Sequence, residues 1–261
     1  MVNEFISAII IAIVQGITEW LPVSSSGHLV LSERLLNFNG GLLFDVALHF
    51  GTLMAVFVYF GRDITEIIKA VLLGKVKEGD GKLGLLLIVA TIPAGIAGFI
   101  FVKLFEGSFT SLAITSFGFG ITGLVLLIAS LDFKGKKGLK ELGYLNALYI
   151  GFIQILSLVP GISRSGTTIS GGLFNGLNEK DAMKFSFLMS IPVIFGANVL
   201  VIGNKTLPPE TIWATLVSFV VGLVTIHVLY KYILNSKKNL RWFAGYTLAL
   251  GVGVLVWALF S

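Results

Sequence analysis

A polar, glycine-bearing segment occurs twice in this sequence, each time within strongly apolar chain. The copies read QGITEWLPVSSSGH at residues 15–28 and QILSLVPGISRSGTT at residues 154–168. A shift of 139 positions superposes Gln15 on Gln154, Ser24 on Ser163 and Ser26 on Ser165. Backbone of this kind is tolerated at membrane depth only where protein or a water-filled cavity satisfies its polar groups. Two copies therefore predict paired re-entrant segments that meet at one site.

The composition indicates an integral membrane protein. Hydrophobic residues make up 55% of the chain and charged residues only 13%, whereas soluble domains carry about 25% charged residues. The chain has no cysteine, which excludes disulfides, thiolate nucleophiles and cysteine metal sites. We expect a single membrane domain over residues 1–261, with repeat halves at approximately 1–132 and 133–261.

Six apolar stretches are close to the roughly 20 residues that a helix needs to cross a bilayer. They lie near residues 44–60, 84–103, 112–131, 185–203, 212–231 and 242–260. Two further apolar regions, 3–36 and 143–176, contain the repeated motifs, so each is predicted to be a broken helix pair. The first of these has no basic leader, so we expect it to belong to the mature fold and not to be a cleaved signal peptide.

The order of elements is a re-entrant pair followed by three spans, and then the same again. Because three is odd, the halves must enter the membrane from opposite faces, as in inverted-repeat folds. The predicted fold is therefore an all-α polytopic membrane protein, with six transmembrane helices plus two re-entrant broken-helix pairs in an inverted repeat. In the alternative topology both broken regions are full spans, which gives eight crossings.

The basic residues favour the six-span topology. It places 15 of the 19 lysines and arginines on one face, leaves Arg164 inside, and puts only Arg34, Lys103 and Lys205 on the other face. The positive-inside rule assigns the basic face to the cytoplasm, so both termini should lie outside. Eight crossings would separate the clusters at 69–82 and 134–140 and weaken this asymmetry. The net charge of +5 thus reflects topology and does not indicate a nucleic-acid partner.

The first motif carries candidate acid, base and metal-binding groups. A carboxylate such as Glu19 in apolar chain costs on the order of 3 kcal/mol on insertion scales unless it is paired or hydrated. It is interpreted as a general base or metal ligand, the alternative being a structural salt bridge. Gln15 lies one helical turn earlier, would share its face, and is a candidate substrate-binding residue. His28 is the histidine expected to move protons, whereas His227 is expected to pack and His49 is left open between the two roles.

Three serines follow Pro22, which is expected to end the helix. Serines at a helix break are commonly caps, but here Glu19 and His28 flank them. A serine beside a base is the usual arrangement for covalent displacement. Ser25 is the candidate nucleophile, with Ser24 and Ser26 as substrate-binding hydroxyls.

The second motif supplies a complementary cation. The guanidinium of Arg164 is a fixed fork suited to bidentate phosphate binding, the alternative being an arginine that snorkels to the interface. Ser163, Ser165 and Thr168 could complete the phosphate shell with hydroxyls. If a helix opens near Gly166, its N-terminus would add N–H donors.

These motifs, QGITE, PVSSSGH and PGISRSGTTIS, resemble those of the undecaprenyl-diphosphate phosphatases of the bacitracin-resistance type, over essentially the whole chain. The resemblance implies a multi-pass enzyme of the bacterial cell (inner) membrane that acts on a polyprenyl diphosphate lipid. It also implies a divalent cation, Mg²⁺ or Ca²⁺, with Glu19 as its ligand. The residues carried over as active-site residues are Glu19, Ser24, Ser25, His28, Ser163, Arg164, Ser165 and Thr168.

The implied reaction is hydrolysis of undecaprenyl diphosphate to undecaprenyl phosphate and inorganic phosphate, which recycles the lipid carrier for peptidoglycan synthesis and confers bacitracin resistance. Arg164 would bind the diphosphate, Ser25 or water would attack, and His28 with Glu19 would manage protons. The family carries Glu or Gln at one position, here Gln15, which argues against a mechanism with two carboxylates in this segment. The alternative functions are a transporter or flippase of a polyprenyl phosphate lipid and a structural membrane subunit. Homodimerisation and the accepted prenyl lengths are left open.

Overall fold

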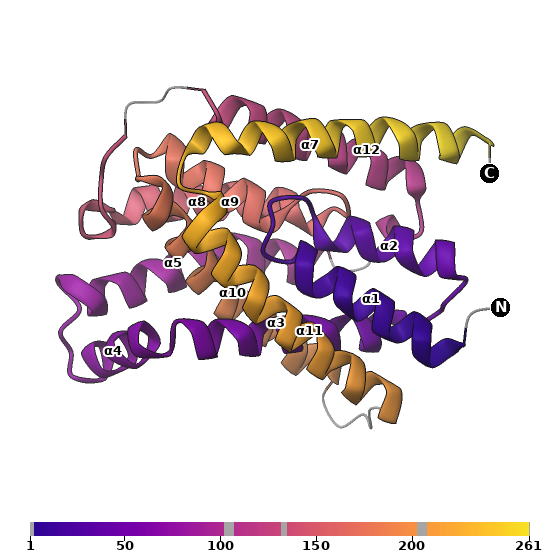
Figure 1. Ribbon diagram of the computed structural model, residues 1–261. Coiled ribbons are helices and arrows are strands. Elements are labelled where there is room, and N and C mark those ends of the chain that lie inside the picture. Colours follow the sequence, from indigo (N-terminus) through magenta and orange to yellow (C-terminus); the bar gives the residue numbers. More distant parts are fainter. Residues whose placement is uncertain (1–2, 102–106, 132–134, 203–207, 261) are drawn as a thin grey trace.

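The structure is a computed structural model that describes residues 3–101, 107–131, 135–202 and 208–260 (Figure 1). Six of its helices are long and apolar enough to cross a membrane, as predicted. They are α3 (Gly41–Tyr59), α5 (Gly79–Ile100), α7 (Leu112–Ala129), α10 (Glu179–Ile202), α11 (Pro209–Val228) and α12 (Leu240–Phe260). The described residues form no β-strand, only an isolated bridge between Lys137 and Leu177, so the all-α prediction is confirmed.

Both motif regions are broken into helices too short to span a bilayer. The first forms α1 (Glu4–Thr18) and α2 (Ser25–Leu36). The second forms α8 (Tyr144–Ile155), the 3-10 turn η2 (Leu156–Leu158) and α9 (Arg164–Phe174). Among the described residues, each half thus contains a broken helix pair followed by three spanning helices. The opposite membrane orientation of the two halves stays a prediction.

The two halves are interleaved. α1 packs against α11 of the second half, and α8 packs against α5 of the first half. Glycines permit both approaches: a Cβ on Gly16 would lie 2.7 Å from the Cβ of Val221, and a Cβ on Gly151 would lie 2.3 Å from the carbonyl oxygen of Ala90. Small residues at helix interfaces allow this close packing within a membrane. The reciprocal packing holds both helix breaks in the interior.

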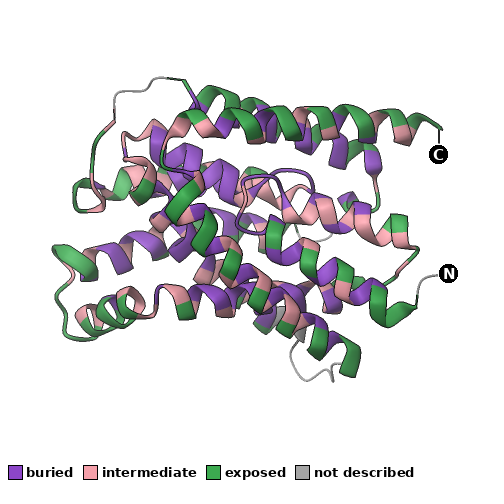
Figure 2. Cartoon of the chain, in the orientation of Figure 1, coloured by how far each residue is buried: buried purple, intermediate pink, exposed green. Residues whose placement is uncertain are grey.

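Burial follows a membrane pattern, with buried residues toward the middle of the bundle and exposed ones on its periphery (Figure 2). The largest core cluster draws on both halves, from Trp20 in the first motif to Phe187 in α10. Many exposed side chains are themselves apolar, among them Phe99, Phe117 and Trp242. A surface of large exposed apolar side chains suits a lipid solvent.

The sequence analysis missed one short helix, α4 (Gly61–Leu72), which follows α3 and packs against α5. Ile67 on its inner face is buried, whereas Ile68 and Leu72 are exposed. Charged residues interrupt the apolar residues along its sequence, so a search for long apolar stretches passes over it. α3, α5 and α10 also begin three to six residues before the predicted starts, which brings Lys180 and Lys184 into α10.

Basic segments distant in sequence meet at one end of the bundle. α1 begins and α12 ends at the opposite end from the segments 73–78 and 135–143 (Figure 1). The Nζ of Lys82 donates to the carbonyl oxygen of Lys140 at 3.3 Å, and Lys184 forms an ion pair with Asp63. We call this end, with residues 61–82, 135–143, 176–184 and 230–241, the lysine-rich end. Lys103, Lys134 and Lys205 lie outside the described residues.

The contact between α7 and the second motif yields a stability prediction. A Cβ on Gly118 would lie 2.2 Å from the carbonyl oxygen of Pro160, whereas a Cβ on Gly120 of the same helix would meet nothing within 4 Å. Gly118→Ala should therefore displace the motif backbone and destabilise the protein by about 1–3 kcal/mol, as overpacking does. Thermal unfolding in detergent should show a lower melting temperature for Gly118→Ala than for the control Gly120→Ala. Equal melting temperatures would contradict the observed packing.

Candidate active site

Each motif ends one helix and begins the next with the same serine cap. The Oγ of Ser24 accepts from the N–H of Gly27 at 3.3 Å, and the Oγ of Ser163 accepts from the N–H of Gly166 at 3.0 Å. Such caps satisfy donors that the first helical turn leaves open. The pairs are related by the 139-residue shift, so the repeated sequence produces a repeated local structure.

The capping serines are joined to further hydroxyls. Ser24 Oγ lies 3.3 Å from Ser26 Oγ, and Ser163 Oγ lies 3.2 Å from Ser165 Oγ. Ser165 Oγ also donates to the carbonyl oxygen of Leu21 at 3.0 Å, which joins the two motifs. Ser24 has a φ of +70°, a region that side chains other than glycine rarely adopt and that is often associated with functional sites. The predicted hydroxyls thus form two small clusters that the structure brings together.

The carboxylate of Glu19 is the centre of the site. Glu19 caps the end of α1 and is only 6% exposed. Its Oε1 accepts from Arg164 Nη2 at 2.6 Å, and its Oε2 accepts from Ser25 Oγ at 2.6 Å. Gln15 Nε2 donates to the same Oε2 at 3.1 Å. Ser25 and Arg164 are the first residues of α2 and α9 and occupy equivalent repeat positions, so one carboxylate connects both copies.

Arg164 is held in the interior and does not snorkel to the interface. Its side chain is 13% exposed. Its Nη1 donates to the carbonyl oxygen of Ser186 at 3.3 Å, and its guanidinium lies 5.4 Å from the ring centroid of Trp20. A buried, paired guanidinium is pre-organised for bidentate recognition of an oxyanion.

Thr168 stands behind Arg164 on α9. Its Oγ1 donates to the carbonyl oxygen of Arg164 at 2.7 Å and lies 2.6 Å from the Oγ of Ser186. Thr168 is fully buried. These contacts fix the start of α9 against α10, whereas its assignment as a phosphate ligand stays a prediction.

The structure places His49, whose role the sequence left open, beside Glu19, whereas His28 lies apart from that carboxylate. His28 is turned toward α12: its Nε2 lies 2.7 Å from the hydroxyl of Tyr246, and its Nδ1 lies 2.7 Å from the carbonyl oxygen of Ser24. The imidazole beside the buried carboxylate belongs to His49, whose Nε2 lies 3.4 Å from Glu19 Oε2. The structure therefore adds His49 to the site and gives His28 no contact with Glu19.

The donors around Glu19 fit a divalent cation that completes its shell with phosphate and water. Gln15 Oε1 is buried and has no partner among the described residues, so it is an oxygen donor beside the carboxylate. The described residues contain no group of three or more histidine, aspartate or glutamate side chains that could hold a metal by themselves. Mg²⁺ in particular is commonly bound by one or two carboxylates together with substrate phosphates.

Together these groups suit phosphoryl transfer. A hydroxyl lies against a carboxylate that can take its proton. A fixed cation and the N-termini of two helices, α2 and α9, converge on the same place, where they would stabilise an anion. Catalysis of phosphoryl transfer consists mainly of positioning and charge stabilisation, which this arrangement supplies.

The ion pair gives a second stability prediction. Glu19→Gln or Arg164→Gln alone should destabilise the protein by roughly 3–5 kcal/mol, because each leaves a buried charge unpaired. The double variant should lose less stability than the sum of the losses in the two single variants. Thermal unfolding of the four proteins measures this coupling. Lys184→Gln with Asp63→Asn provides a control, since that more exposed pair should contribute about 1 kcal/mol or less. Additive losses at Glu19 and Arg164 would contradict the pairing.

Comparison with known proteins identifies the family of this chain. The family model described as "Bacitracin resistance protein BacA" matches residues 8–253. A protein of Thermosipho melanesiensis named undecaprenyl-diphosphatase is 43% identical over 94% of this chain and 96% of its own length. A protein of the same name from Carboxydothermus hydrogenoformans is 40% identical over 97% of both chains. This chain belongs to the bacitracin resistance protein BacA family.

Proposed function

We propose that this chain is an undecaprenyl-diphosphatase, which hydrolyses undecaprenyl diphosphate to undecaprenyl phosphate and inorganic phosphate. The names of its relatives support this activity. The observation that carries it is the bridge from Ser25 through Glu19 to Arg164, which joins a hydroxyl, a base and an anion-binding cation. The reaction recycles the lipid carrier of peptidoglycan synthesis, which accounts for bacitracin resistance.

Arg164 binds the diphosphate in this proposal. Its guanidinium is fixed by Glu19, Ser186 and the ring of Trp20, so little side-chain freedom is lost on binding. The N-termini of α2 and α9 stabilise the charge that builds up on the transferred phosphoryl group. Because both helices begin at the motif breaks, the repeated sequence supplies the groups that stabilise this negative charge.

Ser25 is the proposed nucleophile. Glu19 Oε2 takes the Oγ proton as Oγ attacks the terminal phosphorus, and the bond to the bridging oxygen breaks to release undecaprenyl phosphate. Water then attacks the phosphorus of the phosphoserine, and the bond from phosphorus to Oγ breaks. Glu19 returns the proton to Oγ, and inorganic phosphate leaves with the oxygen of the water. Gln15 and His49 hold the carboxylate from two further sides. His28 of α2 bonds to Tyr246 of α12, and this pair could pass a proton to the leaving group.

A divalent cation, Mg²⁺ or Ca²⁺, belongs to the proposal. Glu19 and the unpartnered Gln15 Oε1 would hold it. When bound, the cation neutralises charge on the diphosphate. The residues of the chain still carry out binding, orientation and proton removal.

A transport protein of the same fold that moves the lipid across the membrane would require an anion-binding site but no nucleophile. The short hydrogen bond between Ser25 and the buried carboxylate is therefore the feature that favours hydrolysis over transport. The flippase alternative has no comparable observation in its support.

The proposed orientation places the lysine-rich end in the cytoplasm and both termini outside the bacterial cell membrane. The meeting of Lys82 with residue 140, and of Lys237 with Glu179, supports one strongly basic face. Basic residues near span ends are retained on the cytoplasmic side.

Ser25→Ala should lower the rate of phosphate release from undecaprenyl diphosphate at least roughly a thousandfold, because it removes the nucleophile. Ser26→Ala, one residue along, loses a hydroxyl whose one partner among the described residues is Ser24, and it should lower the rate about tenfold or less. The assay uses detergent-purified protein with Mg²⁺ or Ca²⁺. If the rate of Ser25→Ala stays within tenfold of the parent rate, Ser25 is not the nucleophile and water is the attacking group.

The orientation can be tested by cysteine labelling, because the chain has no cysteine of its own. Asn39→Cys lies in the exposed link between α2 and α3, and Lys136→Cys lies at the lysine-rich end. A membrane-impermeant maleimide should label Asn39→Cys on intact cells, and Lys136→Cys only after permeabilisation. The reverse pattern would contradict the proposed orientation.

A further inference from the structure

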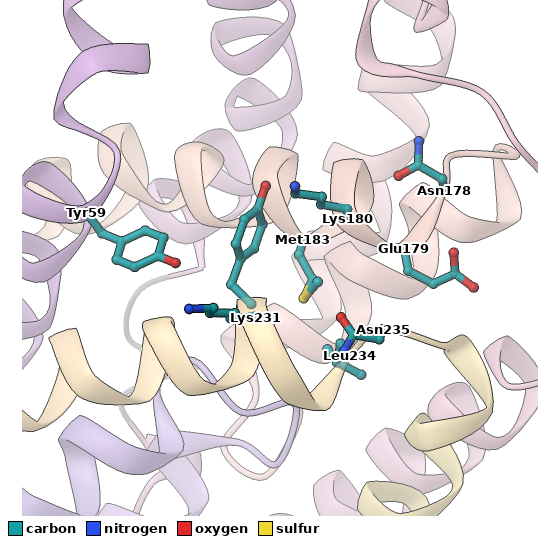
Figure 3. Close-up of a pocket in the computed structure, with 9 residues that line it drawn as sticks. Tyr59, Asn178, Glu179, Lys180, Met183, Lys231, Leu234 and Asn235 are labelled. Atoms are coloured by element: carbon teal, nitrogen blue, oxygen red, sulfur yellow. The ribbon is translucent and has the colours of Figure 1, made fainter.

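A polar cavity of about 510 Å³, distinct from the site around Glu19, opens at the lysine-rich end (Figure 3). Its walls come from the end of α3, the start of α10 and the π-helical segment η3 (Leu229–Ile233) that continues α11. The volume is within the roughly 300–1,000 Å³ typical of ligand sites. π-helical turns are rare and frequently occur at functional sites. The cavity takes no part in the mechanism proposed above.

Two ammonium groups without carboxylate partners line this cavity. Lys180 Nζ lies 5.6 Å from the ring centroid of Tyr230, and Lys231 Nζ lies 5.2 Å from that of Tyr232. In the described part of the chain neither lysine has an aspartate or glutamate within salt-bridge distance. The one acidic residue of the wall, Glu179, accepts from the N–H of Lys237 at 3.2 Å, and its carboxylate points away from both lysines (Figure 3).

Neutral donors complete the lining. The hydroxyls of Tyr59 and Tyr230 line the cavity beside the lysines. The amide of Asn178 is already committed, since its Nδ2 donates to the carbonyl oxygen of Lys137 at 3.1 Å and to Asp181 Oδ2 at 3.0 Å. The Nδ2 of Asn235 donates to the carbonyl oxygen of Tyr232 at 3.2 Å. Neither tyrosine hydroxyl has a hydrogen-bond partner among the residues that the structure describes. Two cations together with two hydroxyls that lack partners are suited to a phosphate oxyanion.

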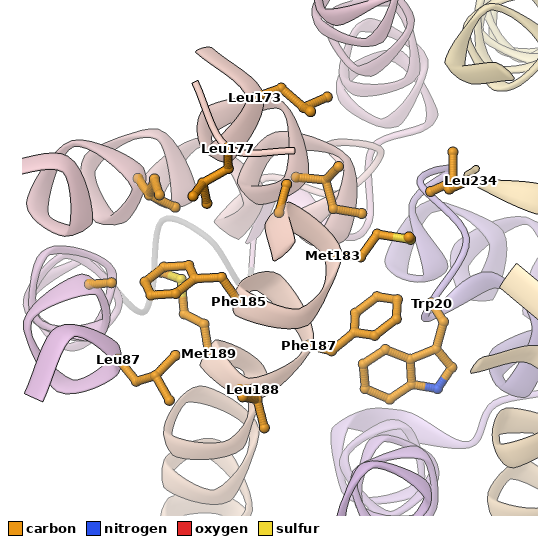
Figure 4. Close-up of a cluster of buried hydrophobic side chains, with 14 of the residues drawn as sticks. Trp20, Leu87, Leu173, Leu177, Met183, Phe185, Phe187, Leu188, Met189 and Leu234 are labelled. Carbon is orange, nitrogen blue, oxygen red and sulfur yellow. The ribbon is translucent and has the colours of Figure 1, made fainter. Parts of the chain in front are cut away.

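Packed aromatic rings separate this cavity from the site around Glu19. The ring of Trp20 contacts Phe187 with centroids 5.1 Å apart (Figure 4). Phe187 contacts Phe60 at 6.3 Å, and Phe60 contacts Tyr230 at 5.5 Å. These rings belong to the buried core or pack against it, so the cavity is a separate site and not an extension of the active site.

We infer that the cavity binds a phosphate group, supplied either by the headgroup of an anionic membrane lipid or by free inorganic phosphate. Lys180 and Lys231 would bind the charge, and the hydroxyls of Tyr59 and Tyr230 would donate to the remaining oxygens. A lipid source suits the setting, since basic residues at the end of spanning helices attract anionic headgroups. The inference does not depend on the proposed hydrolysis.

The test compares three forms of the full chain in neutral detergent: the parent, Lys180→Gln/Lys231→Gln, and the control Lys136→Gln/Lys140→Gln. The control removes the same charge from the same end, outside the cavity. Each protein is titrated with dihexanoyl phosphatidylglycerol and, separately, with inorganic phosphate by calorimetry. The active site is unchanged in all three proteins, so any binding of a probe at that site contributes equally to the three titrations.

Loss of both lysines should weaken binding of at least one probe roughly tenfold or more, since two charge-assisted hydrogen bonds are removed. The control should bind like the parent. A selective loss for phosphatidylglycerol identifies a lipid headgroup site, and a selective loss for inorganic phosphate identifies a free-anion site. Equal binding of both probes by all three proteins overturns the inference.

Discussion

The buried carboxylate of Glu19 is the interaction on which the rest of the structure depends. A carboxylate this deeply buried requires charged and hydrogen-bonding partners, because an unpaired charge in a low-dielectric interior is strongly destabilising. Arg164 and Ser25 supply them from equivalent positions of the two repeats. The two helix breaks must therefore lie side by side, and the interleaving of α1 with α11 and of α8 with α5 brings them there.

The same local chemistry builds the fold and prepares the site. A serine cap starts each of the helices α2 and α9, and the first residue of each helix bonds to Glu19. The polar backbone of the breaks is satisfied by these caps and by hydroxyls such as Thr122, which accepts from the N–H of Ser163 and donates to the carbonyl oxygen of Gly161. Membrane-depth backbone that is not helical is tolerated because the protein itself completes its hydrogen bonds.

Much of this arrangement could be predicted from the sequence, because it rests on local patterns. Apolar length predicts the six spans, proline and serine mark the breaks, and the repeat predicts that Glu19 and Arg164 meet. The partners of the histidines could not be predicted. His28 bonds to Tyr246, 218 positions away, and His49 reaches Glu19 only through the packing of α3 against α1. The cavity beside Lys180 and Lys231 likewise depends on how α3, α10 and η3 converge.

The most direct test of the account is an experimental structure with a methylene diphosphonate analogue of undecaprenyl diphosphate, whose carbon bridge resists hydrolysis. The account predicts that the terminal phosphonate lies within hydrogen-bond distance of both Arg164 and Ser25, with the latter facing the phosphorus. That result would place both repeats at one reaction centre. An analogue that contacts only one repeat, or that binds away from Glu19, would contradict the central claim.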